Sequence, residues 1–190
     1  MLLKNAPEGG GDGLSLPLGD GLRLYLENVD GEVASGFGTV VATVQEADVA
    51  VLRLQSPFEP RDGDVIEAMF HQGDLDFKEP ELGRILGIAR AKPTVVVIAL
   101  DRPAVIPEIA SEAVGLIGHF GASDDVLLDA VFGRFSPSGK LPFELPSSME
   151  AVRNQKEDVP DDSEDPLFPF GFGLTYEEPT EEVAADEPAI

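Results

Sequence analysis

The stretch FGRFSPSGKLPFELP, residues 132–146, and the stretch LFPFGFGLTY, residues 167–176, constrain the backbone more tightly than any other part of this 190-residue chain. Both are rich in glycine, proline and phenylalanine. Gly133 predicts the end of a preceding helix, and SPSG at 136–139 predicts a turn in which proline fixes φ and glycine accepts a positive φ. The prolines of 141–146 are not tolerated in a central strand, so this segment is expected at a sheet edge or wrapped around the domain.

This order of residues resembles the closing section of the second domain of glycoside hydrolase family 3. Members of that family end a helix on Phe-Gly, continue with Pro-x-Gly-(Lys/Arg)-Leu-Pro and finish on Pro-Phe-Gly-x-Gly-Leu-(Ser/Thr)-Tyr. LLKN at 2–5 and LSLPL at 14–18 resemble the stretches with which members enter that domain. The resemblance implies that residues 1–176 form the family's C-terminal α/β domain, and we interpret residues 177–190 as an acidic, disordered tail.

Strand and helix patterns alternate along the chain. Residues 22–27 alternate with period two, which predicts a strand buried on one face, and the apolar run at 49–54 predicts a central strand of a parallel sheet. Residues 79–92 have the stripe of an amphipathic helix. Further strands are expected at 94–100 and 114–120, and helices at 107–113 and 123–132. This alternation predicts a three-layer α/β sandwich, a mostly parallel sheet with helices on both faces, as the family's second domain is described.

The charge of the chain is strongly acidic. It has 36 acidic and 13 basic residues and a formal net charge of −23. Such a surface repels nucleic acid and anionic lipid, so we expect neither as a partner. No apolar run approaches the roughly 20 residues that span a bilayer, and the first residues do not read as a signal peptide, so localisation stays open with a cytoplasmic protein as the default. The acid excess is typical of halophiles, and an ordinary acidic protein is the alternative.

The excess of acid predicts a dependence of stability on salt. The Debye length falls from about 10 Å at 0.1 M salt to about 3 Å at 1 M, so molar KCl should suppress most of the repulsion among the carboxylates. We expect the melting temperature to rise clearly between dilute buffer and molar KCl in a thermal unfolding series. Chloride is the salt to use, because sulfate strengthens apolar burial by itself. A flat melting temperature across the series would exclude the halophile interpretation.

Neither a cofactor nor a metal is expected from the residues. The glycine-rich loop at 9–13 has no predicted strand before it and no helix after it, which argues against phosphate binding. His71 and His119 are the two histidines of the chain, and neither has carboxylates at metal-ligand spacing. No serine lies in a Gly-x-Ser-x-Gly elbow, so serine hydrolase chemistry has no support.

Ligands of open α/β sheets bind at the carboxyl ends of the strands, so the segment after 49–54 is the first candidate site. Family members carry Pro-Tyr-(Thr)-Glu followed by Gly-Asp at this point, and in some members that glutamate is the general acid/base. The resemblance assigns this role to Glu59, which follows the aromatic residue directly and not one position later. Phe58 and Asp64 are then candidate sugar contacts. The alternative is a glutamate on a surface loop.

The segment 69–77 is the second candidate. His71, Gln72 and Asp74 offer donors and acceptors to sugar hydroxyls beside aromatic rings, and the alternative for the histidine is a bond to its own loop backbone. Arg102, in a turn resembling the family's Gly-Arg-Pro, is interpreted as structural. Phe58, Phe70 and Phe77 are expected on an exposed face that a partner covers.

In this family the nucleophile is an aspartate on an N-terminal TIM-type barrel. The resemblance therefore implies the C-terminal domain of a retaining, exo-acting β-glycosidase of the β-glucosidase or β-xylosidase type. We expect this domain to supply one wall of the sugar site, with the barrel on a separate or missing polypeptide and no activity in the isolated chain. The alternative is a non-catalytic domain that binds carbohydrate or stabilises a partner.

Overall fold

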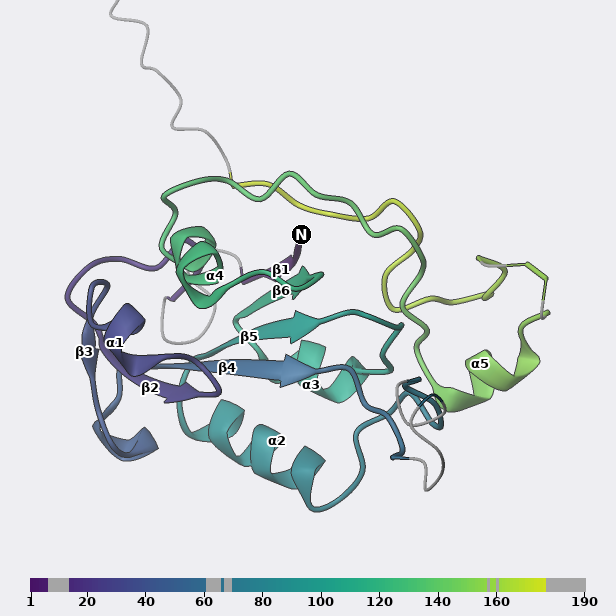
Figure 1. The fold of residues 1–190 in the computed structure, drawn as a ribbon, viewed down its shortest axis with the longest axis horizontal. Coiled ribbons are helices and arrows are strands. Elements are labelled where there is room, and N and C mark those ends of the chain that lie inside the picture. Colours follow the sequence, from purple (N-terminus) through teal and green to yellow (C-terminus); the bar gives the residue numbers. More distant parts are fainter. Residues whose placement is uncertain (7–13, 61–65, 67–69, 157, 160, 177–190) are drawn as a thin grey trace, which may run out of the picture.

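The computed structural model describes residues 1–6, 14–60, 66, 70–156, 158, 159 and 161–176. Within them the sheet has six strands in the order β1-β6-β5-β4-β2-β3 (Figure 1). Neighbouring strands run parallel except β1, which pairs with β6 in the antiparallel sense. The bounds are β1 Leu2–Asn5, β2 Arg23–Glu27, β3 Thr39–Val40, β4 Val49–Gln55, β5 Thr94–Ala99 and β6 Gly115–His119.

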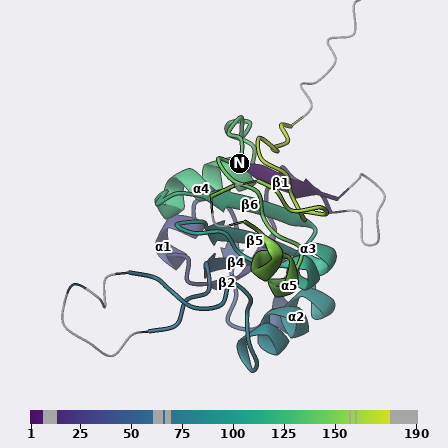
Figure 2. The same cartoon turned by 90° about the vertical axis from the view of Figure 1, so that its right-hand side faces the viewer.

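Helices cover both faces of this sheet, as the sequence predicts. Helices α2 and α3 pack on one face, and α4 and α1 lie on the other (Figures 1 and 2). Helix α5 and the short 3-10 helix η1 lie outside these pairs. The bounds are α1 Gly31–Ala34, η1 Val44–Glu46, α2 Glu81–Ala91, α3 Pro107–Glu112, α4 Asp124–Val131 and α5 Met149–Asn154. No helix in the described part of the chain is long and apolar enough to cross a bilayer.

The central strands β4 and β5 contribute to both cores of the domain. Leu52 and Val96, which lie opposite each other in the ladder, pack with α2 and α3. Val49, Val95 and Val97 face the other way and pack with α4. This two-sided burial explains why β4 and β5 read as almost continuous apolar runs and do not alternate.

The two glycine- and proline-rich stretches lie side by side as a strap across the domain. The Leu141 N–H donates to the Phe172 carbonyl and the Leu145 N–H donates to the Phe168 carbonyl, each at 2.8 Å. In Figure 1 these stretches form the green and yellow lines across the top of the molecule. Of the two positions expected for residues 141–146, a sheet edge or a segment wrapped around the domain, the structure shows the second. The strap also reaches β1, since the Leu174 N–H donates to the Leu2 carbonyl at 2.7 Å.

Two local features differ from the sequence-based expectations. Gly133 ends α4 with φ of 73°, as predicted, but the expected turn at 136–139 is absent from the structure, where Gly139 does not have a positive φ. Gly139 is instead a site of close approach, because a Cβ there would lie 2.9 Å from Met1 Cγ. Helix α2 begins at Glu81, with Pro80 just before its first turn and not within it.

Candidate functional site

The carboxyl edge of the sheet contains a pocket of about 440 Å³. The strand order changes direction between β2 and β4, because the chain leaves β2 for β3 on one side and then builds β4, β5 and β6 on the other. Such switch points leave a crevice at the carboxyl ends of the strands. The pocket lies there, lined by Asn28 after β2, by Leu54 to Glu59 at and after the end of β4, by Asp74 and Asp76 to Lys78, and by Glu79 to Glu81 at the start of α2.

Glu59 lies at this pocket on the exposed segment that follows β4. Its N–H donates to the Gln72 carbonyl at 2.8 Å, so the two candidate segments lie against each other. Its side chain lies over Gly73, where a Cβ would approach Glu59 Cδ to 2.5 Å and where φ is +83°. Glycine at position 73 is thus required both by the backbone conformation and by the packing of Glu59.

His71 is oriented by a carboxylate on another strand end. Its Nδ1 bonds to Oδ2 of Asp101, which follows β5, and not to its own loop backbone as the alternative expectation had it. The ring stacks on Phe58, with centroids 3.9 Å apart and planes 10° apart. The other carboxylate oxygen of Asp101 accepts a hydrogen bond from Gln55 Nε2. The structure therefore brings Phe58 and His71 together.

Arg102, next to Asp101, fixes the loop that carries His71 by binding the backbone of that loop. Its guanidinium donates to the Gln72 carbonyl at 2.6 Å and to the Gly73 carbonyl at 2.7 Å. The Arg102 carbonyl accepts a hydrogen bond from the buried Ser56 hydroxyl at 3.0 Å. The contacts of Arg102 agree with its interpretation as structural, and the carbonyls it binds belong to the facing loop.

The remaining predicted site residues have different surroundings. Asp74 accepts a 2.8 Å bond from Lys78, and this hydrogen bond, with the lysine charge, holds the pKa of Asp74 below its ordinary value. Asp64 lies outside the described residues.

The three phenylalanines expected on an exposed face do not all lie there. Phe58 and Phe70 are 42% and 68% exposed, as expected of an interface. Phe77 is only 5% exposed and packs with the α2 and α3 core, so its assignment to the exposed face is wrong.

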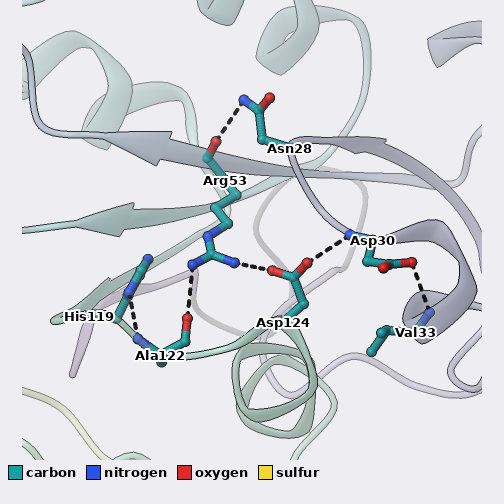
Figure 3. Close-up of polar contacts among 7 residues, drawn as sticks. All are labelled: Asn28, Asp30, Val33, Arg53, His119, Ala122 and Asp124. Atoms are coloured by element: carbon teal, nitrogen blue, oxygen red, sulfur yellow. Dashed lines mark hydrogen bonds and ion pairs between the residues drawn. The ribbon is translucent and has the colours of Figure 1, made fainter.

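A polar network that the sequence analysis missed lies at the same edge, on the α4 side (Figure 3). Arg53 of β4 pairs with Asp124 at the start of α4 and donates to the Ala122 carbonyl at 2.9 Å. Asp124 also accepts the Asp30 N–H at 2.8 Å, and Asn28 Nδ2 donates to the Arg53 carbonyl at 3.1 Å. The signal in the sequence is an arginine inside the apolar run VAVLRL, which requires a partner for its charge.

The network places the chain's own charged groups at two helix N-termini. Asp30 caps α1 by accepting the Glu32 N–H at 2.8 Å, and Asp124 occupies the first position of α4. These carboxylates already lie where a phosphate would bind in a doubly wound fold. Among the described residues, no group of three or more His, Cys, Asp or Glu side chains is arranged to hold a metal ion.

His119, at the end of β6, is 6% exposed. Its Nδ1 accepts the Ala122 N–H at 3.3 Å, and its Nε2 is buried without a hydrogen-bond partner among the residues that the structure describes. Burial, followed by the positive charge of Arg53, lowers the pKa of His119 to about 4. The imidazole is therefore neutral at pH 7, with the hydrogen on Nε2.

This buried imidazole predicts a loss of stability in mild acid. Between the ordinary pKa of 6.5 and the folded value of about 4, the unfolded chain binds a proton that the folded chain does not. The free energy of unfolding therefore decreases as the pH is lowered through that window. The decrease due to His119 should be about 2 kcal/mol between pH 7 and pH 5.

The measurement is urea unfolding of the wild type and His119→Asn at both pH values. Asparagine can still accept the Ala122 N–H but does not titrate, so the variant should lose about 2 kcal/mol less than the wild type. Equal losses in the two proteins would contradict the predicted role of His119. The comparison also removes the effect of the many carboxylates, since both proteins carry them.

These observations define a three-layer α/β domain with a pocket at the carboxyl edge of its sheet, lined by both charged and apolar side chains. The chain matches the family model described as the glycosyl hydrolase family 3 C-terminal domain over residues 4–176, and it belongs to that family. The resemblance stated from the two glycine- and proline-rich stretches is thereby confirmed.

Curated relatives include β-glucosidase C of Emericella nidulans, which is 48% identical over 167 residues, covering 86% of this chain and 27% of the relative. The periplasmic β-glucosidase/β-xylosidase of Dickeya chrysanthemi is 39% identical over 165 residues, covering 85% of this chain and 25% of the relative. The chain therefore spans about a quarter of the length of these relatives.

Solved structures share the fold at lower identity. The β-glucosidase from Listeria innocua in complex with glucose has a TM-score of 0.69 at 20% identity, covering 93% of this chain and 32% of that chain. β-Glucosidase 3B from Thermotoga neapolitana in complex with glucose has a TM-score of 0.64 at 16% identity. The match covers 92% of this chain and 36% of that chain. These likenesses support the fold.

Proposed function

We propose that this domain supplies one wall of the sugar site of a retaining, exo-acting β-glycosidase of the β-glucosidase type, and that Glu59 is its general acid/base. The observation that carries the proposal is the position of Glu59 at the carboxyl-edge pocket, next to the stacked Phe58 and His71. The family membership and the names of the relatives support the substrate class.

The proposal divides the two carboxylates of a retaining mechanism between two parts of the enzyme. Such a mechanism needs a nucleophile about 5–5.5 Å from the acid/base. Because this chain spans about a quarter of its curated relatives, we place the nucleophile and the rest of the sugar site on the additional length, in the TIM-type barrel that the family resemblance implies.

Among the carboxylates at the pocket, Glu59 suits proton transfer better than Asp74 does. The hydrogen bond from Lys78 lowers the pKa of Asp74, which keeps it ionised and makes it a poor proton donor. Asp74 is then a hydrogen-bond acceptor for sugar hydroxyls. The ion pairs described at this pocket involve Asp74 and Asp76 and not Glu59, which is why we assign the proton-transfer role to Glu59 and not to Asp74.

The exposed aromatic rings at this edge support a partner that covers it. Phe70 and Phe58 lie on segments that project from the carboxyl edge, and exposed apolar groups that gather on one face mark interaction sites. A barrel docked there would remove water from Glu59 and bring its nucleophile toward the pocket, which strengthens the electrostatic interactions inside.

The second candidate function is a non-catalytic domain that binds carbohydrate or stabilises a partner. The exposed position of Glu59 favours it, because a stacked Phe58–His71 pair with polar neighbours can bind a sugar without proton transfer. The two functions differ in one respect: only the first requires the Glu59 carboxyl for turnover.

A domain exchange tests the proposed function. We would replace the matching C-terminal portion of the Emericella nidulans β-glucosidase C with residues 1–176 of this chain and assay nitrophenyl β-glucoside hydrolysis. We expect a folded chimera that hydrolyses the substrate within about tenfold of the parent, a change equivalent to about 1.4 kcal/mol. A chimera that folds and assembles but shows no hydrolysis would contradict the proposal.

A further inference from the structure

Two consecutive residues after β5 make contacts with three consecutive residues of the facing loop. Asp101 binds the His71 ring, and Arg102 binds the Gln72 and Gly73 carbonyls. The contacting residues are 29 or 30 positions apart in the sequence, so the pairing is a product of the fold. Together they fix the ring of His71 and the backbone that carries it.

The His71–Asp101 contact determines the tautomer of the imidazole. An ionised carboxylate only accepts hydrogen bonds, so the hydrogen of the neutral ring lies on Nδ1. Nε2 then carries a lone pair and acts as an acceptor. The Gln55 amide orients the carboxylate through its second oxygen, and Phe58 covers one face of the ring.

Stability alone does not account for this arrangement. The His71 and Asp101 side chains are 34% and 42% exposed, and ion pairs at such exposure contribute little to folding. Contacts from Asp101 and Phe58 nevertheless restrict one half-exposed ring, and Phe58 itself lines the carboxyl-edge pocket. Restricting a side chain in advance lowers the entropy cost of binding, which is what a ligand site requires.

We propose that Asp101 is a positioning residue, which holds His71 as the Nδ1–H tautomer so that Nε2 accepts a hydrogen bond from a sugar hydroxyl. Arg102 supports it by fixing the Gln72–Gly73 backbone. The sugar as ligand rests on the proposed function. A neutral hydroxyl suits this acceptor better than an anion does, because the Asp101 carboxylate already lies against the ring.

The tautomer can be measured in the 190-residue chain itself. Two-bond ¹H–¹⁵N correlation spectra of ¹⁵N-histidine-labelled protein distinguish the two ring nitrogens. We expect His71 as Nδ1–H and His119 as Nε2–H, because Nδ1 of His119 accepts the Ala122 N–H. The two histidines of the chain thus provide opposite patterns in one spectrum.

Substitution of Asp101 tests its role directly. Asp101→Ala should convert His71 to a mixture of tautomers and leave His119 unchanged, and Asp101→Asn should preserve part of the preference. Asp129→Asn is the matched control, since Asp129 is also a surface aspartate with a charged partner, at 2.9 Å from Arg134. A His71 already in the Nε2–H form, or one that Asp101→Ala does not alter, would overturn the proposal.

A glucose titration tests the ligand half. We expect glucose to shift the His71 Nε2 resonance and Asp101→Ala to weaken binding about two- to tenfold, the value of one hydrogen bond. Glucose that shifts the amides of Gln55 and Asp74 but not His71 would overturn this proposal and leave the proposed function standing. Glucose that shifts nothing at the edge would overturn the sugar as ligand of His71 in this chain, while the tautomer spectra still decide the role of Asp101 and the chimera assay decides the proposed function.

Discussion

The purified 190-residue chain is expected to leave aryl β-glucosides unhydrolysed, with nitrophenol release no faster than in buffer. A retaining glycosidase forms a covalent intermediate on its nucleophile, and an acid/base alone cannot replace that step. If the nucleophile lies on the barrel, the chain has no route to the intermediate. The measurement is nitrophenol release at high protein concentration over long incubation.

The control is the same assay on the chimera with the Emericella nidulans enzyme, in which the covalent step is supplied. Hydrolysis by the isolated chain that persists in Glu59→Gln would contradict both the division of the two carboxylates and the assignment of Glu59. Hydrolysis that Glu59→Gln abolishes would place a nucleophile within this chain. That result would contradict the division alone.

Removal of the Asp124 carboxylate is expected to cost about 2–3 kcal/mol of unfolding free energy. The Arg53 and Asp124 side chains are only 28% and 17% exposed, so Asp124→Ala leaves a poorly hydrated guanidinium with the Ala122 carbonyl as its remaining partner. The Asp30 N–H loses its acceptor as well. Breaking one partner of a buried pair costs about 3–5 kcal/mol, and we reduce that figure for the partial exposure here.

Thermal unfolding of Asp124→Ala should therefore show a melting temperature about 5–10 °C lower, since 1 kcal/mol corresponds to about 2–4 °C at this size. Asp129→Ala is the matched control, because it breaks an ion pair with Arg134 whose side chains are 33% and 58% exposed. The control should change stability by less than about 1 kcal/mol. Equal losses in the two variants would contradict the importance of the Arg53–Asp124 network.

The sequence predicted the elements whose signals are local. Continuous apolar runs indicate buried strands, and the structure has β4 and β5 at these positions. The prolines of 141–146 exclude a central strand, and the structure has the strap there. Strand β1 was missed because four residues, LLKN, gain their strand character only by pairing with β6, 110 to 115 positions away. The turn expected at 136–139 was wrong because Gly139 serves a close contact with Met1, which no local pattern indicates.

The candidate site was predictable in its location but not in its pairings. The rule that ligands lie at strand carboxyl ends selected the segments that carry Glu59 and His71, and the structure places them together. The sequence could not show that the Phe77 side chain packs into the core, because an aromatic residue in a polar loop can lie either inward or at the surface. The partner of His71 could not be found either, since Asp101 lies 30 positions away and meets it only through the fold.

The central claim is that this domain contributes the acid/base of a β-glycosidase, and the chimera allows it to be tested through Glu59→Gln. Loss of a general acid should lower kcat/KM by about 10²–10⁴ for alkyl or unactivated aryl β-glucosides, which need a protonated leaving group. For dinitrophenyl β-glucoside, whose leaving group needs no proton, kcat/KM should fall far less. Glu81→Gln, at the same pocket, is the control.

The most direct measurement is the turnover of dinitrophenyl β-glucoside by the Glu59→Gln chimera with and without azide. Without its base the variant should accumulate the covalent intermediate, and azide, a nucleophile that needs no deprotonation, should accelerate turnover and give β-glucosyl azide. Equal losses for activated and unactivated substrates, with no effect of azide, would contradict the assignment of Glu59 and favour a non-catalytic domain.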